Sequence, residues 1–108
     1  MGQDCKLYVV QKYGTEWYVE GALHLSRDYR LFEAMGDALK ETPPQDFASL
    51  GHVYPMHTRD GWDGDEPVTR AAVLKPIELQ PTTHRLNKAA WAYLRELPDE
   101  TPIIVVWC

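Results

Sequence analysis

The segment from His24 to Phe32 holds the side chains best suited to binding chemistry. It reads His-Leu-Ser-Arg-Asp-Tyr-Arg-Leu-Phe and crosses from a strand-like run into a helix-like one. The first backbone N–H groups of a helix have no partner within the helix, so basic side chains beside them can complete an anion site. A phosphate or a partner's carboxylate would suit this corner, with the candidate residues Arg27, Asp28, Tyr29 and Arg30. The competing interpretation is a capped helix start whose arginines pair with neighbouring acids.

A second group lies on the helix expected over 84–97. Its members recur at helical spacing within a sector of about 60°: His84, Lys88, Trp91 and Arg95. A basic helix face that contains an aromatic ring can stack on a nucleotide or contact an acidic protein. Lys88, Trp91 and Arg95 are therefore further candidate binding residues, with a solvated basic face as the alternative.

Acidic side chains form patterns of the opposite sign. Glu33, Asp37 and Glu41 recur every fourth residue, and more acids follow in the glycine-rich stretch that ends at Glu66. Such a face can dock on a basic protein or mimic a nucleic-acid backbone, and solubility alone also explains it. Trp62 and Asp63 are candidate contact residues in that stretch, because an aromatic ring among acids and glycines can anchor a partner.

Motifs for catalysis, metals and cofactors do not occur in the sequence. The histidines and acids of 52–66 miss the EF-hand spacing, and HExxH, GxSxG and phosphate-binding loops are absent. Cys5 and Cys108 lie at opposite ends of the chain without a CxxC pattern. We therefore predict no metal, no cofactor and no enzymatic activity, while a small hydrolase-like enzyme with its site in the loop stays open as an alternative.

Size and charge bound the remaining possibilities. The 108 residues are 44% hydrophobic and 25% charged, which suits one core and a single domain over 1–108. A formal net charge of −5 argues against direct nucleic-acid binding, because such affinity comes from lysines and arginines that displace counterions. Neither a signal-peptide pattern nor a long apolar run occurs, so we expect a cytoplasmic protein with no membrane contact.

The elements that must position these residues begin with a β-hairpin. The runs 6–12 and 17–25 flank a type II′ turn at Gly14, which sets Val10 opposite Val19 and Tyr8 opposite Gly21. This register predicts one core face: Tyr8, Val10, Trp17, Val19, Leu23 and Leu25. The other face, which holds Leu7 and Val9, is half apolar and suggests a covered surface or a homodimer interface.

Helices and further strands complete an α+β pattern. Ser26 should cap a helix from about Arg27 to Glu41, and Thr82 or Thr83 a second one over 84–97. The apolar stripe expected for the second helix is Leu86, Ala89, Ala90, Tyr93, Leu94 and Leu97. The runs 68–74 and 102–107 read as strands, and 42–67 as a long surface excursion. We predict a single α+β domain, with the hairpin in a mixed or antiparallel sheet of about four strands packed by two helices.

The segment from His24 to Phe32 also resembles a motif of small tailed-bacteriophage proteins. In that family an N-terminal hairpin ends in a run like His-Leu-Gly-Arg-Asn/Asp-Tyr-x-Leu-Phe, where this chain has Ser26 in place of the glycine. The likeness covers the hairpin and the first helix, and the family's later Ser/His-Trp-Leu-Thr-Leu run has no counterpart after Glu66. No activity comes with the motif. The resemblance implies a phage-encoded accessory protein in the bacterial cytosol.

Two binding hypotheses of different classes follow. The first is an inhibitor that binds a host or defence protein stoichiometrically, through the 27–30 corner, the acidic helix and the loop around Trp62. The second is sequestration of a small anionic ligand such as a nucleotide signal. Its binding residues would be Arg27, Arg30, Lys88, Trp91 and Arg95.

Overall fold

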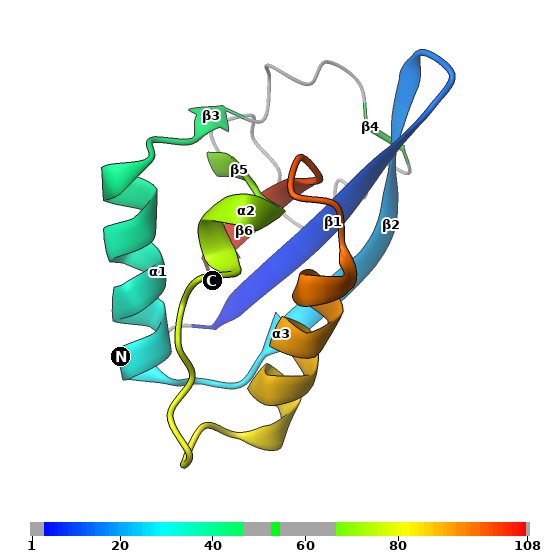
Figure 1. The fold of residues 1–108 in the computed structure, drawn as a ribbon. Helices are drawn as coiled ribbons and strands as arrows, with labels where there is room; N and C mark the ends of the chain where they lie inside the picture. Colours follow the sequence, from blue (N-terminus) through cyan, green and yellow to red (C-terminus); the bar gives the residue numbers. More distant parts are fainter. Residues whose placement is uncertain (1–3, 47–52, 55–66, 108) are drawn as a thin grey trace.

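The sheet and helices of this chain form the predicted α+β domain. The computed structural model describes residues 4–46, 53–54 and 67–107 (Figure 1). Strands β1 (Cys5–Tyr13), β2 (Glu16–Leu25), β5 (Pro67–Arg70) and β6 (Pro102–Trp107) pair antiparallel in the order β5-β6-β1-β2. Two-residue strands extend the edges: β3 (Gln45–Asp46) pairs antiparallel with β5, and β4 (Val53–Tyr54) pairs parallel with β2.

The hairpin forms around the predicted turn. Gly14 has a φ of 65°, and no other described residue has a positive φ, as a type II′ turn with glycine at its first central position requires. Lys12 lies opposite Trp17 and Val10 opposite Val19, as expected. A bulge at Glu20 then shifts the register, so that Gly21 pairs with Val9 and not with Tyr8.

The bulge corrects the predicted faces of the hairpin. An inserted residue moves every later side chain of its strand to the opposite face of the sheet. Leu23 and Leu25 therefore join Leu7 and Val9 on one face, while Tyr8 and Val10 stay on the other with Trp17 and Val19. Leu7 and Val9, whose apolar character suggested a homodimer interface, belong to the core beneath the helices.

Three helices contribute to that core: α1 (Tyr29–Glu41), the short α2 (Ala71–Leu74) and α3 (Arg85–Glu96). Their buried side chains pack with those of the sheet face that holds Leu7 and Val9: Leu31, Phe32, Met35, Leu74, Ala90, Trp91 and Leu94. Figure 1 shows α1 and α3 running in the same direction, so that both end toward the side from which the hairpin projects.

Three local predictions are wrong. His84, and not Thr82 or Thr83, caps α3, because its Nδ1 accepts a hydrogen bond from Leu86 N. Ser26 does not cap α1, because the Asp28 carboxylate accepts a hydrogen bond from Leu31 N at 3.1 Å and the helix starts at Tyr29. The run 68–74 is a strand only to Arg70, whose partner Pro102 is the first residue of β6. Beyond that pair the chain turns into α2, since the N–H groups of Ala71 and Ala72 donate to carbonyls of the 98–101 loop instead of to a strand.

Candidate functional site

The 27–30 corner matches the capped-helix interpretation. The carboxylate of Asp28 accepts from Leu31 N and places a negative charge at the amino end of α1, which disfavours an anion there. Arg27 Nη2 lies 3.7 Å from Asp4 Oδ1, in an exposed ion pair. Tyr29 is 63% exposed, and Arg30 is exposed beside a small hollow whose other wall holds Glu78. The corner presents exposed side chains and no enclosed anion site.

The predicted basic face of α3 lacks its aromatic ring, although His84, Lys88 and Arg95 are exposed. Trp91 is 0% exposed, and its indole N–H donates to the Leu74 carbonyl at 3.0 Å, so it cannot stack on a ligand. Lys88 Nζ donates to Pro81 O at 2.9 Å, and Arg95 Nη2 lies 3.5 Å from Ile77 O. His84 caps the helix through Nδ1, which accepts from Leu86 N. Trp91, Lys88 and Arg95 thus contact backbone carbonyls of the segment 74–81, and the burial of Trp91 corrects the nucleotide-platform interpretation.

The buried stripe of α3 is rotated from the predicted one. It consists of Asn87, Ala90, Trp91 and Leu94, whereas Leu86 is 56% exposed. Asn87 is fully buried because its amide pairs with one backbone residue: Ser26 N donates to Oδ1 at 2.8 Å, and Nδ2 donates to Ser26 O at 2.9 Å. Sequence reasoning missed this residue, since only the helix phase could have indicated it.

The predicted contact residues Trp62 and Asp63 lie outside the described residues. The remaining candidate surface is a groove made of three neighbouring hollows.

The first of these, the helix hollow, lies between the carboxyl-terminal half of α1 and α2 and has a volume of about 520 Å³. Asp37 and Glu41 stand on its α1 wall. The apolar part of its lining comes from both helices and the residues after α2: Ala34, Ala38, Ala72, Val73, Pro76 and Ile77. It combines a small-residue floor with an acidic rim.

The second hollow, the central recess, opens where β6 begins and measures about 440 Å³. Pro102 has no backbone N–H to donate, so the start of β6 ends the ladder. The hairpin extends beyond this point, since β6 pairs only with residues 5–9 of β1, whereas β1 pairs with β2 as far as Tyr13. Most of the recess is apolar: Trp17, Pro43, Pro44, Val68, Val73 and Pro102.

The third, the hairpin hollow, measures about 470 Å³ and lies between the hairpin and the loop after α3. Glu20 and Glu96 line it, as does Lys12, whose Nζ lies 5.5 Å from the ring centroid of Trp17. Thr42, Arg70 and Val73 line both the helix hollow and the central recess. The central recess and the hairpin hollow share Trp17, Glu100 and Pro102. The three hollows are therefore adjacent, and we call them together the acidic groove.

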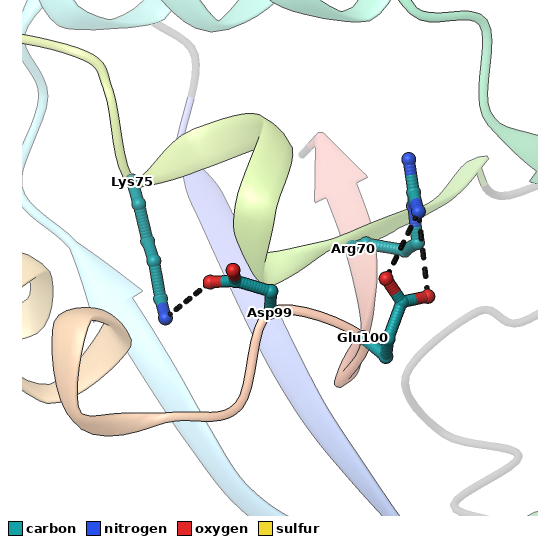
Figure 2. A network of polar contacts seen from close by, with 4 residues as sticks. All are labelled: Arg70, Lys75, Asp99 and Glu100. Atoms are coloured by element: carbon teal, nitrogen blue, oxygen red, sulfur yellow. Dashed lines mark hydrogen bonds and ion pairs between the residues drawn. The ribbon is translucent and has the colours of Figure 1, made fainter.

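Two ion pairs hold the α2 wall of this groove in place (Figure 2). Arg70 Nη1 donates to both carboxylate oxygens of Glu100, at 3.2 and 3.3 Å, and Lys75 Nζ lies 2.8 Å from Asp99 Oδ1. Lys75 also donates to the Leu97 carbonyl. Together with the backbone bonds from Ala71 and Ala72, these contacts fix α2 against the loop that precedes β6.

Acids outnumber bases along the groove. Its charged lining consists of Asp37, Glu41, Glu20, Glu96 and Glu100 against Arg70 and Lys12. Glu100 is paired with Arg70, whereas the other four carboxylates form no ion pair with any described residue. Because α1 ends at Glu41 and α3 at Glu96, their carbonyl ends add negative partial charge to the same surface. This arrangement favours cations attached to an apolar segment.

The pKa of Tyr93 is affected by one of these acids, Glu20. Burial, together with the nearby carboxylate of Glu20, raises the pKa of Tyr93 above its ordinary value. Its hydroxyl lies beside β2, where a Cβ added to Gly21 would be 3.7 Å away. Within the described part of the chain, no group of three or more His, Cys, Asp or Glu side chains is arranged to hold a metal ion. The groove therefore offers charge and shape for binding.

The fold and groove define a small α+β domain with an acidic groove on its surface. Comparison with known proteins does not narrow this class: no family model matches the chain, and no curated protein or solved structure matches it. None of the described helices is long and apolar enough to cross a membrane.

Proposed function

We propose that this chain is a protein-binding module that holds a basic segment of a partner protein in the acidic groove. The observation that carries the proposal is the adjacency of three hollows whose unpaired charges, among the described residues, are mostly carboxylates. Protein surfaces that meet in a complex carry complementary charge, which steers association and selects the partner. The acidic α1 helix thus contributes its carboxylates to a concave surface that can enclose a segment.

The kind of partner comes from the resemblance of the 24–32 segment to small phage proteins. We propose a host or defence protein in the bacterial cytoplasm, inhibited by stoichiometric binding and without catalysis. A basic segment is a fitting target, because proteins that act on nucleic acids expose lysine- and arginine-rich surfaces. An acidic protein that covers such a surface would block it.

Capture from bacterial lysate with matched variants tests the proposal. Asp37→Lys/Glu41→Lys reverses the charge of the helix hollow, whereas Glu33→Lys changes an exposed acid on the same helix that does not line the groove. A protein retained by the native chain and by Glu33→Lys, lost by the double variant and eluted by oligolysine would support it. Equal capture by the native chain and the double variant would contradict it.

A thermal-shift screen against nucleotides addresses the anionic-ligand alternative. The groove proposal expects no rise in melting temperature, because anions meet an acidic surface and Trp91 has no face free for stacking. A rise that Arg27→Ala or Arg30→Ala abolishes would favour the alternative and contradict the proposed function.

A further inference from the structure

We infer that the segment held by the acidic groove has a basic–apolar–basic pattern, with its apolar residue in the central recess. This inference rests on the proposed function and specifies its partner. It comes from the order of the three hollows, since the recess, whose two charged side chains pair with each other, lies between two acidic hollows and shares residues with both.

The central recess has no charge to offer a cation. Its charged side chains, Arg70 and Glu100, satisfy each other through two contacts of 3.2 and 3.3 Å. A basic side chain placed there would meet the Arg70 guanidinium and would have to compete with it for Glu100. Apart from Thr42 and Thr69, the other lining residues are apolar, with Trp17, Val68 and Pro102 among them. An apolar side chain gains burial there at no electrostatic cost.

The two flanking hollows differ from the recess and from each other. Asp37 and Glu41 lie one turn apart on α1, and no described cation neutralises them. The hairpin hollow also holds two such acids, Glu20 and Glu96, but Lys12 stands beside them over the Trp17 ring. Both flanks therefore favour cations, because acids outnumber the one basic side chain that lines each of them, Arg70 in the helix hollow and Lys12 in the hairpin hollow.

Selection of short random-sequence peptides displayed on a surface, against the folded full chain, tests the pattern without assuming a spacing. We expect the enriched peptides to carry two groups of lysine or arginine separated by at least one large apolar residue. Selection against Asp37→Lys/Glu41→Lys should yield peptides that have lost one of the two basic groups. Glu33→Lys should select the native pattern, because Glu33 does not line the groove.

Arg70→Gln gives the sharpest test of the recess. The Arg70 side chain is half exposed, so the variant should fold, and it leaves Glu100 without its partner. We expect a lysine or arginine to replace the central apolar residue in peptides selected against this variant. An unchanged apolar centre would overturn its assignment to the recess.

The outcomes separate this inference from the proposed function. Enrichment of basic peptides without an apolar centre would overturn the pattern and leave the basic-segment function standing. Enrichment of acidic peptides, or no enrichment at all, would overturn both. Circular dichroism and a melting curve for each variant confirm that a lost preference does not reflect an unfolded chain.

Discussion

The two long helices use their charged faces in different ways. On α3, Lys88 donates to the Pro81 carbonyl, the Trp91 indole donates to that of Leu74, and Arg95 lies near that of Ile77. The acids of α1, Asp37 and Glu41, line a hollow and pair with no described residue. A charged helix face therefore becomes a binding surface only where no segment of its own chain crosses it. Changes at Lys88 and Trp91 should affect stability, and changes at Asp37 and Glu41 should affect binding.

The largest effect should come from Trp91. Trp91→Ala removes a fully buried ring and its hydrogen bond to Leu74, which should lower the free energy of unfolding by about 3–5 kcal/mol. Urea denaturation followed by circular dichroism measures the loss. Leu86→Ala is the control, since Leu86 is 56% exposed on the same helix and its loss should cost less than about 0.5 kcal/mol. Equal losses of unfolding free energy at the two positions would mean that Trp91 is not buried, which would contradict the proposed difference between the helices.

Asn87 should have the next largest effect. Asn87→Ala leaves the N–H and C=O of Ser26 without their partners, which should cost about 1–3 kcal/mol of unfolding free energy. Ser26→Ala keeps both bonds, because they use only the backbone of Ser26, and α1 is capped by Asp28. The Ser26 variant should therefore be nearly neutral in the same denaturation measurement. A loss of about 1 kcal/mol at Ser26 would instead restore it as the helix cap.

Exchange of one charge on each helix makes the comparison direct. Lys88→Met removes the hydrogen bond to Pro81 and should cost about 0.5–1.5 kcal/mol of stability without altering capture of the partner. Asp37→Asn should raise stability by about 0.2–0.5 kcal/mol, because it relieves repulsion from Glu33 and Glu41 one turn away. The same Asp37 variant should weaken partner capture. Reversed roles, with capture lost at Lys88 and stability lost at Asp37, would refute the division between the helices.

How far the sequence predicted this molecule depended on how local each determinant is. The turn at Gly14 and the pairing next to it follow from a few neighbouring residues, and both are confirmed. The bulge at Glu20 was missed because one inserted residue leaves a strand's composition unchanged, yet it reverses which face Leu23 and Leu25 occupy.

The phase of α3 shows a limit of another kind. Its adjacent apolar residues permit two buried stripes, one with Leu86 and one with Trp91. Burial of the larger indole favours the second, which also buries Asn87. Burial of the Asn87 amide is tolerated because it forms two hydrogen bonds with the backbone of Ser26, which is 61 positions away in the sequence. The sequence also did not predict the groove, although it identified the acids of α1. The other walls of the groove come from α2, the 97–102 loop and the hairpin, which are distant in sequence.

The smallest effect should appear at high pH, where Tyr93 connects the groove to stability. Burial and the Glu20 carboxylate raise the pKa of Tyr93 in the folded state, so the unfolded chain releases this proton first. The contribution is therefore complete below the ordinary tyrosine pKa of about 10 and is lost as pH rises through the folded-state pKa. Glu20→Gln should lower the pKa of Tyr93, as measured by ultraviolet titration of tyrosinate with Tyr93→Phe identifying the signal. An unchanged titration in Glu20→Gln would show that burial alone sets this pKa. It would also place the Glu20 charge away from the α3 side of the groove.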